Sequence, residues 1–365
     1  MALKCGIVGL PNVGKSTLFN CLSSAKAQSA NFPFCTIEPN IGVITVPDER
    51  LNTLSELVNP ERIMPTTVEI VDIAGLVKGA SKGEGLGNQF LGNIRECNAI
   101  IHVLRCFDDG NIVHVDGSVD PVRDKDVIDM ELQLKDLDTV EKRLDKAKKA
   151  ARTGDKEAIK ILAIIEKYQS HLEAGKSIRS LDIDEESVKL IGDMQLLTEK
   201  PVLYVCNVDE VSAVSGNNHT KAVEELVKDE ECEVMYLCAG IESDISELET
   251  YDEKQMFLEE LGLEEPGVSH LIKKAYKLLD LETYFTAGVK EVRAWTINAG
   301  MKAPQAAGVI HTDFEKGFIR AEVIKYNDFV ELGSEAACRE KGKLNVEGKE
   351  YVVQDGDVMH FRFNV

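Results

Sequence analysis

Gly9-Leu10-Pro11-Asn12-Val13-Gly14-Lys15-Ser16 is the stretch that decides how the N-terminal part of this chain folds. It matches G-x-x-x-x-G-K-[ST], the pattern of a loop whose backbone N–H groups surround phosphates. An apolar run at residues 4–8 precedes it, and residues 17–22 follow it with the pattern of a helix. A strand, this loop and a helix in that order predict an α/β domain that holds phosphate at a helix N-terminus.

Two side chains of this loop have the chemistry that a bound triphosphate requires. Lys15 can reach the β- and γ-phosphate oxygens, and we expect it to be catalytic. The hydroxyl of Ser16 can bind Mg²⁺. The alternative, a glycine turn with a structural role only, explains neither side chain.

Composition narrows the class of protein. The 365 residues suffice for about two or three domains, and 44% are hydrophobic and 29% charged. No apolar stretch is long enough to cross a bilayer, and the N-terminus lacks the order of a signal peptide. The nine cysteines contain no C-x-x-C pair, which argues against zinc and disulfide frameworks. We therefore expect a cytoplasmic protein without a membrane partner.

Charge is uneven along the chain. The net charge of −21 argues against general binding to nucleic acid, and no DNA partner is expected. One basic stretch stands out, and it is either a solvated helix face or a contact for RNA or an acidic partner. Its members are Lys142, Arg143, Lys146, Lys148, Lys149, Arg152, Lys156 and Lys160.

Five strand-like apolar runs are separated by helical or loop segments. This alternation predicts a mostly parallel sheet flanked by helices, in a domain like those of G proteins. The runs cover residues 4–8, 67–73, 99–107, 202–207 and 233–238.

The gap before the fourth run has a helical pattern. Apolar residues recur at spacings of three and four over residues 137–151 and again over 158–172, with a break at 153–155. Two helices that share an apolar seam predict an antiparallel coiled-coil hairpin. A shorter helix near residues 188–196 would return to the sheet, so we expect a helical insertion over about 128–199.

The pattern changes again near residue 281. Short β-type runs at residues 292–297, 317–323, 350–353 and 358–363 predict a separate small α+β domain. We therefore divide the chain into a nucleotide-binding domain, residues 1–280, and a C-terminal domain, residues 281–365.

The segment D-x-x-G, from Asp72 to Gly75, ends the second strand-like run. Asp72 can orient Mg²⁺ through a bound water, and the N–H of Gly75 can sense the γ-phosphate. Thr36, in the segment 31–36, is expected to complete the Mg²⁺ shell as part of a switch loop. The alternative for this segment is a surface turn set by Pro33.

The residue after D-x-x-G is Leu76, where many GTPases have a glutamine that orients the attacking water. Leucine has no polar atom for this task. Hydrolysis therefore needs another group or is slow. His114 is one candidate, and a purely structural role for it is equally consistent with the sequence.

Residues 207–210 occupy the place of the guanine-binding N-K-x-D motif. Val208 replaces the lysine and Glu210 replaces the aspartate, so the guanine preference is weakened. Asn207 can still hydrogen-bond the N6/N7 edge of adenine, and we place Asn207 and Val208 in the nucleotide site. These residues alone do not establish a preference for ATP.

The motifs together resemble those of the Obg-like ATPases, YchF subfamily, which are P-loop NTPases related to translation factors. The similar segments are 9–16, 31–39, 72–91 and 207–210, with the C-terminal segments 283–292 and 303–323 resembling a TGS domain. The resemblance extends over essentially the whole chain.

This resemblance implies ATP as the preferred substrate and a β-grasp fold for the TGS domain. It places ATP contacts on Asn12, Val13, Gly14, Lys15, Ser16 and Thr17, and Mg²⁺ on Ser16 and Thr36. It further implies a K⁺ site at Asn12, a mobile catalytic histidine at His114, and association with ribosomes.

The resulting hypothesis is a Mg²⁺-dependent ATPase that acts as a nucleotide-controlled switch. We expect it to bind ATP and ADP, the ribosome, with the large subunit preferred, and rRNA. Two alternatives remain: a GTPase, and a ribosome-docking module with negligible hydrolysis.

Overall fold

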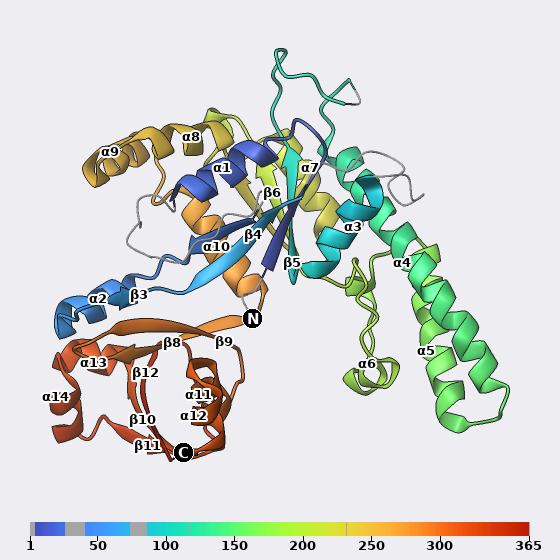
Figure 1. The fold of residues 1–365 in the computed structure, drawn as a ribbon. Coiled ribbons are helices and arrows are strands. Elements are labelled where there is room, and N and C mark those ends of the chain that lie inside the picture. Colours follow the sequence, from blue (N-terminus) through green and yellow to red (C-terminus); the bar gives the residue numbers. More distant parts are fainter. Residues whose placement is uncertain (1–3, 26–40, 74–85, 116, 231, 365) are drawn as a thin grey trace. The chain divides into compact units, whose positions relative to one another are not determined.

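The computed structural model describes residues 4–25, 41–73, 86–115, 117–230 and 232–364. The chain forms two compact units. Unit 1 comprises Met1–Ile44 and Glu69–Leu271, and unit 2 comprises Thr45–Val68 and Ile272–Val365. Each unit contains one six-stranded sheet (Figure 1).

The sheet of unit 1 has the strand order β2-β4-β1-β5-β6-β7. The pairs β4–β1, β1–β5, β5–β6 and β6–β7 are parallel, which confirms the predicted parallel sheet. Every residue of β5 and β6 is buried, as expected for central strands covered on both faces. The strands are β1 (Lys4–Val8), β2 (Ile41–Thr45), β4 (Thr67–Asp72), β5 (Ala99–Arg105), β6 (Val202–Asn207) and β7 (Glu233–Leu237).

Helices surround this sheet (Figure 1). They are α1 (Lys15–Ala25), α3 (Leu86–Glu96), α7 (Asn218–Val227), α8 (Ala239–Glu247), α9 (Tyr251–Leu261) and α10 (Gly267–Leu278), with the 3₁₀ turn η4 (Glu210–Ser212). The helix α6 (Glu185–Ile191) and the 3₁₀ turn η3 (Ile178–Ser180) pack against the long helical hairpin instead. Within the described residues, no helix combines the length and the apolar character needed to span a membrane.

The predicted helical hairpin is formed by α4 (Pro121–Ala151) and α5 (Lys156–Glu173). Their shared seam includes Val140, Leu144 and Ile165, all buried. The helix α4 begins at Pro121, ahead of the start of about 128 expected for the insertion, because Asp120 caps its N-terminus and Pro121 occupies its first turn. The shorter helix α6 ends at Ile191, earlier than predicted, because Gly192 follows it with φ 69°.

The sheet of unit 2 has the order β11-β10-β12-β8-β9-β3. One face packs on α11 and α12 around a core that contains Tyr284 and Phe361, and the other packs on α2, α13 and α14 around Phe285 and Phe329. The elements are α2 (Glu49–Val58), β3 (Ile63–Met64), β8 (Leu281–Ala287), β9 (Val292–Asn298), α11 (Ala303–Ile310), α12 (Thr312–Lys316), β10 (Phe318–Lys325), α13 (Tyr326–Leu332), α14 (Glu335–Glu340), β11 (Asn345–Glu347) and β12 (Asp357–Phe363).

One predicted strand of this unit is wrong. Residues 350–353 form only an isolated bridge, between Val352 and Lys302. The pairing stops there because the partner segment turns into the helix α11 at Ala303.

Unit 2 also contains residues that the predicted division kept with residues 1–280. Leu51 and Leu54 of α2 are buried in the same core as Phe285, and β3 pairs in parallel with β9. Arg50 donates to Asp355 over 2.6 Å. The segment 45–68 is therefore part of unit 2 rather than unit 1.

Candidate nucleotide site

The loop 9–16 connects the carboxyl end of β1 to the first residue of α1. Asn12 and Gly14 have φ values of 64° and 98°, so the chain turns tightly here. A Cβ atom on Gly14 would lie 2.3 Å from Nδ2 of Asn207, so no larger residue fits without rearrangement. The local geometry explains the glycine of the motif.

Lys15 is buried at the centre of the loop. Its side chain donates from Nζ to the carbonyl oxygen of Leu10 over 2.7 Å, and the residue is 7% exposed. Burial lowers the pKa of Lys15 to about 8, against an opposing effect of the nearby Asp72 carboxylate. A second, strongly anionic partner such as a phosphate would therefore favour the charged ammonium.

Asp72 lies at the carboxyl end of β4, the strand next to β1. Its Oδ1 is buried and has no hydrogen-bond partner among the described residues. Burial raises the pKa of this carboxyl group, and Lys15 acts in the opposite direction. Ser16 is exposed in the first turn of α1. An unsatisfied carboxylate oxygen and an accessible hydroxyl are oxygen ligands of the kind that Mg²⁺ prefers, so the residues fit this ion.

Two predicted residues of the site, Thr36 and Gly75, fall outside the described part of the chain. So does Leu76, which replaces the glutamine of many GTPases.

A cleft of about 740 Å³ adjoins the loop, within the range of small-molecule sites. Asn12, Gly14 and Thr17 form its side at the loop. The opposite walls come from the ends of three neighbouring strands, where open α/β sheets bind ligands. These walls consist of Phe107, Asp109 and Ile112 after β5, Asn207 to Val211 at the end of β6, and Cys238 to Gly240 after β7.

The side chain of Asn207 makes two hydrogen bonds that connect segments around this cleft. Its Nδ2 donates to the carbonyl oxygen of Val13 over 2.9 Å, and its Oδ1 accepts from the N–H of Ala239 over 3.0 Å. Val208 is 2% exposed and lines the cleft beside it. The amide of Asn207 therefore joins the phosphate loop to the start of α8, and only one of its N–H groups is left for a base.

His114 has the buried environment expected for a structural role, one of the two alternatives that the sequence left open. Its Nε2 lies 2.8 Å from Oδ2 of Asp124, in the first turn of α4, and both side chains are almost fully buried. Arg123 also donates to Asp124, over 3.0 Å. His114 is not among the residues of the cleft, although Asn12 donates to the carbonyl oxygen of the adjacent Val113. Asp124 was not predicted from the sequence, where an acidic residue in a first helical turn was the only signal.

Arg105 was also missed. It ends the apolar strand β5, is 1% exposed, and donates to carbonyl oxygens of the loop that lines the cleft. The only indication in the sequence was a basic residue at the end of an otherwise apolar strand.

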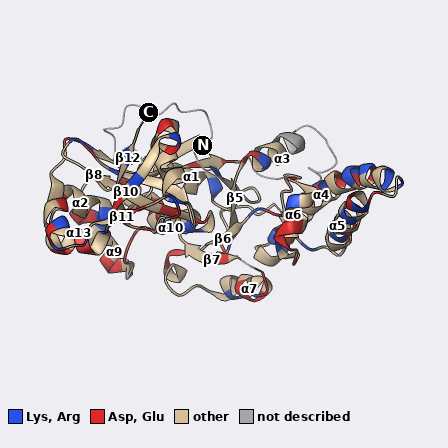
Figure 2. Cartoon of the chain, turned by 90° about the horizontal axis from the view of Figure 1, so that it is seen from below, with Lys and Arg blue, Asp and Glu red and all other residues tan. Residues whose placement is uncertain are grey.

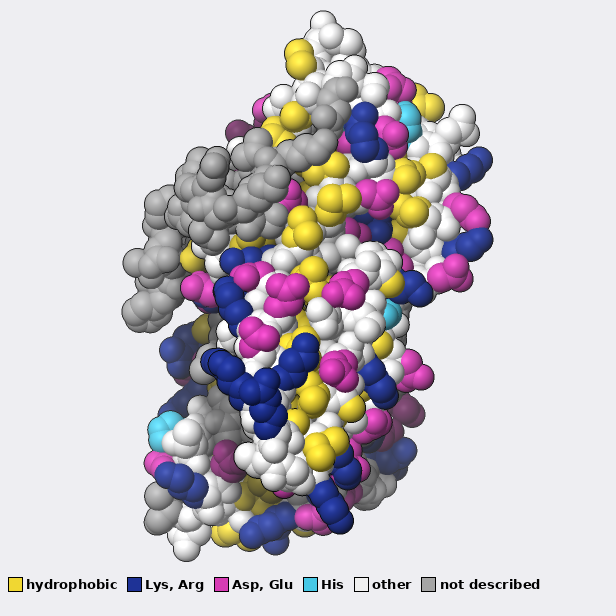
Figure 3. Space-filling model, turned by 90° about the vertical axis from the view of Figure 1, so that its right-hand side faces the viewer, with side chains coloured by type: hydrophobic (Ala, Val, Ile, Leu, Met, Phe, Trp, Pro, Cys, Tyr) yellow, Lys and Arg dark blue, Asp and Glu magenta, His cyan; other side chains and the backbone are white. Residues whose placement is uncertain are grey.

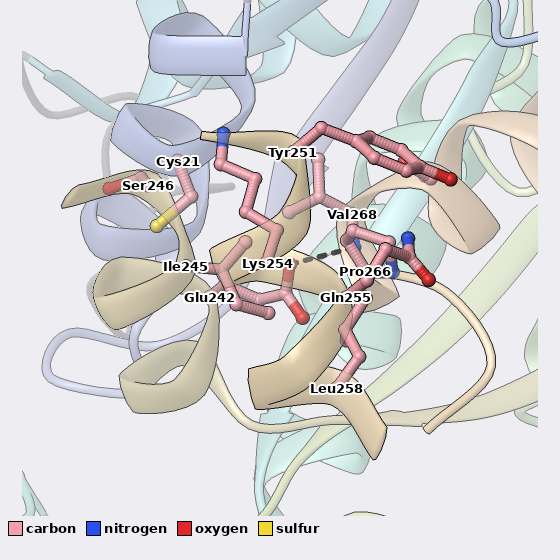
Figure 4. Close-up of a pocket in the computed structure, with 11 residues that line it drawn as sticks. Cys21, Glu242, Ile245, Ser246, Tyr251, Lys254, Gln255, Leu258, Pro266 and Val268 are labelled. Atoms are coloured by element: carbon pink, nitrogen blue, oxygen red, sulfur yellow. Dashed lines mark hydrogen bonds between the residues drawn. The ribbon is translucent and has the colours of Figure 1, made fainter. Parts of the chain in front are cut away.

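A second, smaller pocket of about 280 Å³ lies between α1, α8, α9 and α10 (Figure 4). Cys21, Ile245 and Leu258 contribute to its mostly apolar lining. Glu242 on its wall accepts from the N–H groups of Gly267 and Val268 over 2.8 and 3.1 Å. The carboxylate thus fixes the N-terminus of α10 rather than facing an open site.

The parallel sheet, the loop at the end of β1 and the buried Lys15 beside Asp72 define a P-loop NTPase of the GTPase-like fold. Two family profiles match the chain. One, described as a 50S ribosome-binding GTPase, matches residues 4–167. The other is the YchF-GTPase C-terminal family, described as a protein of unknown function, and it matches residues 281–364.

The chain belongs to the YchF family. It is 57% identical to a protein of Bacillus subtilis (strain 168) and 56% identical to one of Escherichia coli O157:H7, both named ribosome-binding ATPase YchF, over 100% of each chain. The solved structure of the Schizosaccharomyces pombe YchF GTPase superimposes with a TM-score of 0.90 at 40% identity, covering 99% of this chain and 97% of that one. The resemblance inferred from the motifs is confirmed.

Proposed function

We propose that this protein is a Mg²⁺-dependent ATPase of the cytoplasm whose nucleotide state controls its binding to the ribosome. The observation that carries this proposal is the buried ammonium of Lys15 under the phosphate loop, with the half-buried carboxylate of Asp72 near it and the cleft beside the loop. The names of the relatives from Bacillus subtilis and Escherichia coli supply the substrate and the partner.

In this proposal the backbone of residues 12–17 holds the phosphates. Lys15 stabilises the negative charge that develops between the β- and γ-phosphates during transfer to water. Ser16 and Thr36 bind Mg²⁺ and Asp72 orients it; the ion neutralises phosphate charge when bound. Gly75 senses the γ-phosphate.

Two further roles follow from the site. The side-chain oxygen of Asn12 is a ligand of the type that binds K⁺, while its Nδ2 donates to Val113 over 3.0 Å. We assign this residue to K⁺. His114 is assigned to the attacking water, which requires that it first separate from Asp124, because the pair is buried as described.

The residues at the end of β6, where the base is expected to bind, favour ATP over GTP. Asp209 uses its carboxylate to cap η4, by accepting from the N–H of Ser212 over 2.9 Å, and Glu210 is exposed. Val208 stands where the guanine-binding motif has its lysine. Tighter binding of GTP than of ATP in a competition assay would instead favour a GTPase, the activity for which the Schizosaccharomyces pombe relative is named.

The switch is tested by ribosome binding in different nucleotide states. We expect the protein with a non-hydrolysable ATP analogue and Mg²⁺ to sediment with ribosomes more strongly than the protein with ADP, because the γ-phosphate orders segments that ADP does not contact. Parallel assays measure ATP hydrolysis with and without ribosomes. Equal binding with both nucleotides, together with negligible hydrolysis, would favour a docking module.

The hairpin supplies a surface for rRNA. Lys146, Lys148 and Lys149 are exposed on the last turns of α4, and no ion pair is recorded for them among the described residues. In Figure 2, much of the ribbon at the free end of α4 and α5 has the blue of Lys and Arg residues. In Figure 3, which faces the side of the hairpin, Lys and Arg form a compact group. A phosphate backbone is the partner that such a surface fits best.

Replacing Lys146, Lys148 and Lys149 with glutamine is expected to weaken ribosome binding about tenfold at moderate salt and to reduce its salt dependence, because fewer counterions are released. The matched control replaces three exposed lysines elsewhere in unit 1, Lys176, Lys189 and Lys221. Sedimentation over a salt series measures both effects. An unchanged salt dependence would show that the hairpin does not contact RNA.

The description of the profile matching residues 4–167 names the 50S subunit, which supports the large subunit as the docking partner. We also assign a TGS domain of the β-grasp type to residues 281–365, the C-terminal part of unit 2, and a coiled-coil insertion to about 128–199 of the nucleotide-binding unit 1. The mixed sheet of unit 2 and the seam of α4 and α5 support these assignments.

A further inference from the structure

The guanidinium of Arg105 is a buried cation at the carboxyl end of the central strand β5. The residue is 1% exposed, and it lies opposite Asn207 in the register with β6. No carboxylate is recorded as its partner among the described residues. A charged group in such a place is costly unless every donor is used.

All recorded partners of Arg105 belong to one loop. Its Nε donates to the carbonyl oxygen of Phe107 over 3.2 Å, Nη1 to that of Ile112 over 3.0 Å, and Nη2 to that of Asp109 over 3.1 Å. The guanidinium carbon also lies 4.7 Å from the centre of the Phe107 ring. One side chain therefore holds the loop from residue 107 to residue 112 at three points.

The same three residues form a wall of the cleft beside the phosphate loop. The next residue along, Val113, accepts from Asn12 of the phosphate loop over 3.0 Å. Ile112 and Val113 are 39% and 74% exposed, so the loop has little apolar packing of its own to fix it. Its shape depends on the buried guanidinium beneath it.

We infer that Arg105 is a positioning residue for nucleotide binding: it holds the wall formed by residues 107–112 in its ligand-binding shape before the nucleotide arrives. A loop that is already ordered loses less conformational entropy when the ligand binds, which strengthens the affinity. Arg105 acts through the loop and does not touch the phosphates. The inference rests on the proposed function, according to which this cleft binds the nucleotide.

Lysine cannot replace this group, because a single ammonium lacks the planar fork that reaches three carbonyl groups in fixed directions. For Arg105→Lys we expect the KM for ATP and the Kd for ADP to rise by about tenfold, with kcat at saturating ATP unchanged within about twofold. ATP and ADP should lose affinity equally, because the wall lines the cleft together with Asn207 and Val208, the proposed base contacts, whereas Lys15 and Asp72 do not line it. The matched control is Arg143→Lys on α4, whose guanidinium also donates to a carbonyl oxygen, that of Ile191, over 3.0 Å.

Unchanged KM and Kd in a folded Arg105→Lys protein would overturn the inference, and so would a fall in kcat at constant KM. Hydrogen–deuterium exchange of the wild-type protein provides a test without a variant. We expect the amides of Asn111 and Ile112, which donate to Asp109, to be protected before ADP is added and to change little afterwards. Protection that appears only with ADP would also overturn it. Failure of the wild-type protein to bind ATP or ADP would instead refute the proposed function.

Discussion

Lys15→Met is expected to lower kcat for ATP by about a hundred- to a thousandfold, the cost of removing one preorganised charge from a phosphoryl-transfer site. The ammonium lies under the phosphate loop, where burial has removed it from water and Asp72 is its recorded electrostatic partner. Steady-state hydrolysis at saturating ATP measures the effect. The matched control is Lys4→Met on the same strand–loop unit, a partly exposed lysine 3.6 Å from Glu69, which should retain full activity.

Lys15→Met also tests how the buried ammonium affects the free energy of unfolding. The pKa of Lys15 is about 8 in the folded protein and about 10.5 when exposed, so the unfolded chain binds more protons between these values. The free energy of unfolding of the nucleotide-free wild type should therefore rise, relative to that of Lys15→Met, by about 2 kcal/mol from about pH 8 to about pH 10. Chemical denaturation at the two pH values measures this difference. No difference between the proteins would mean that the pKa of Lys15 is not lowered.

Asp136→Ala is expected to destabilise unit 1 by about 4 kcal/mol, because it removes a buried carboxylate and leaves its donors without partners. Asp136 on α4 is fully buried. It accepts from the N–H of Leu197 over 2.8 Å, and from the N–H and the hydroxyl of Thr198, each over 2.7 Å. These three bonds join the hairpin to the segment that leads into β6. Denaturation followed by far-UV circular dichroism measures the loss.

The control for Asp136 lies on the same helix. Asp138 is 46% exposed at its side chain and pairs with Lys142, so Asp138→Ala should change the free energy of unfolding by no more than about 0.5 kcal/mol. Comparable losses of unfolding free energy in the two variants would show that α4 tolerates no change at either position. The hydrogen bonds of Asp136 would then not account for its effect.

The central strands β5 and β6 could be predicted from the sequence because they are buried on both faces and therefore form continuous apolar runs. The strand β2 at the end of the sheet was not predicted, because its burial alternates over only five residues. The first turns of α4 were not predicted, because the apolar seam with α5 begins only near Leu137, whereas the helix begins directly after its cap, Asp120. The run at 350–353 was predicted as a strand because local β propensity does not reveal that its partner ends at α11.

The motif spacing predicted that Lys15, Ser16 and Asp72 lie close together, and the structure places them at the ends of the adjacent parallel strands β1 and β4. Asp124 and Arg105 could not be found in this way. Their partners are a histidine and a set of main-chain carbonyl groups, and both contacts arise only when a loop folds back on its own strand or on a following helix.

The path of the chain through unit 2 restricts how the protein can be divided. Residues 45–68 contribute α2 and β3 to that unit, although they lie between β2 and β4 of the other sheet. A fragment that starts at residue 281 would lack Leu51 and Leu54 from its core, and one that ends at residue 280 would carry those leucines without their partner Phe285. No single cut in the chain yields two intact units, because unit 2 is built from two separate stretches of the sequence. A fragment designed from sequence boundaries alone would therefore not match a folded unit of this protein.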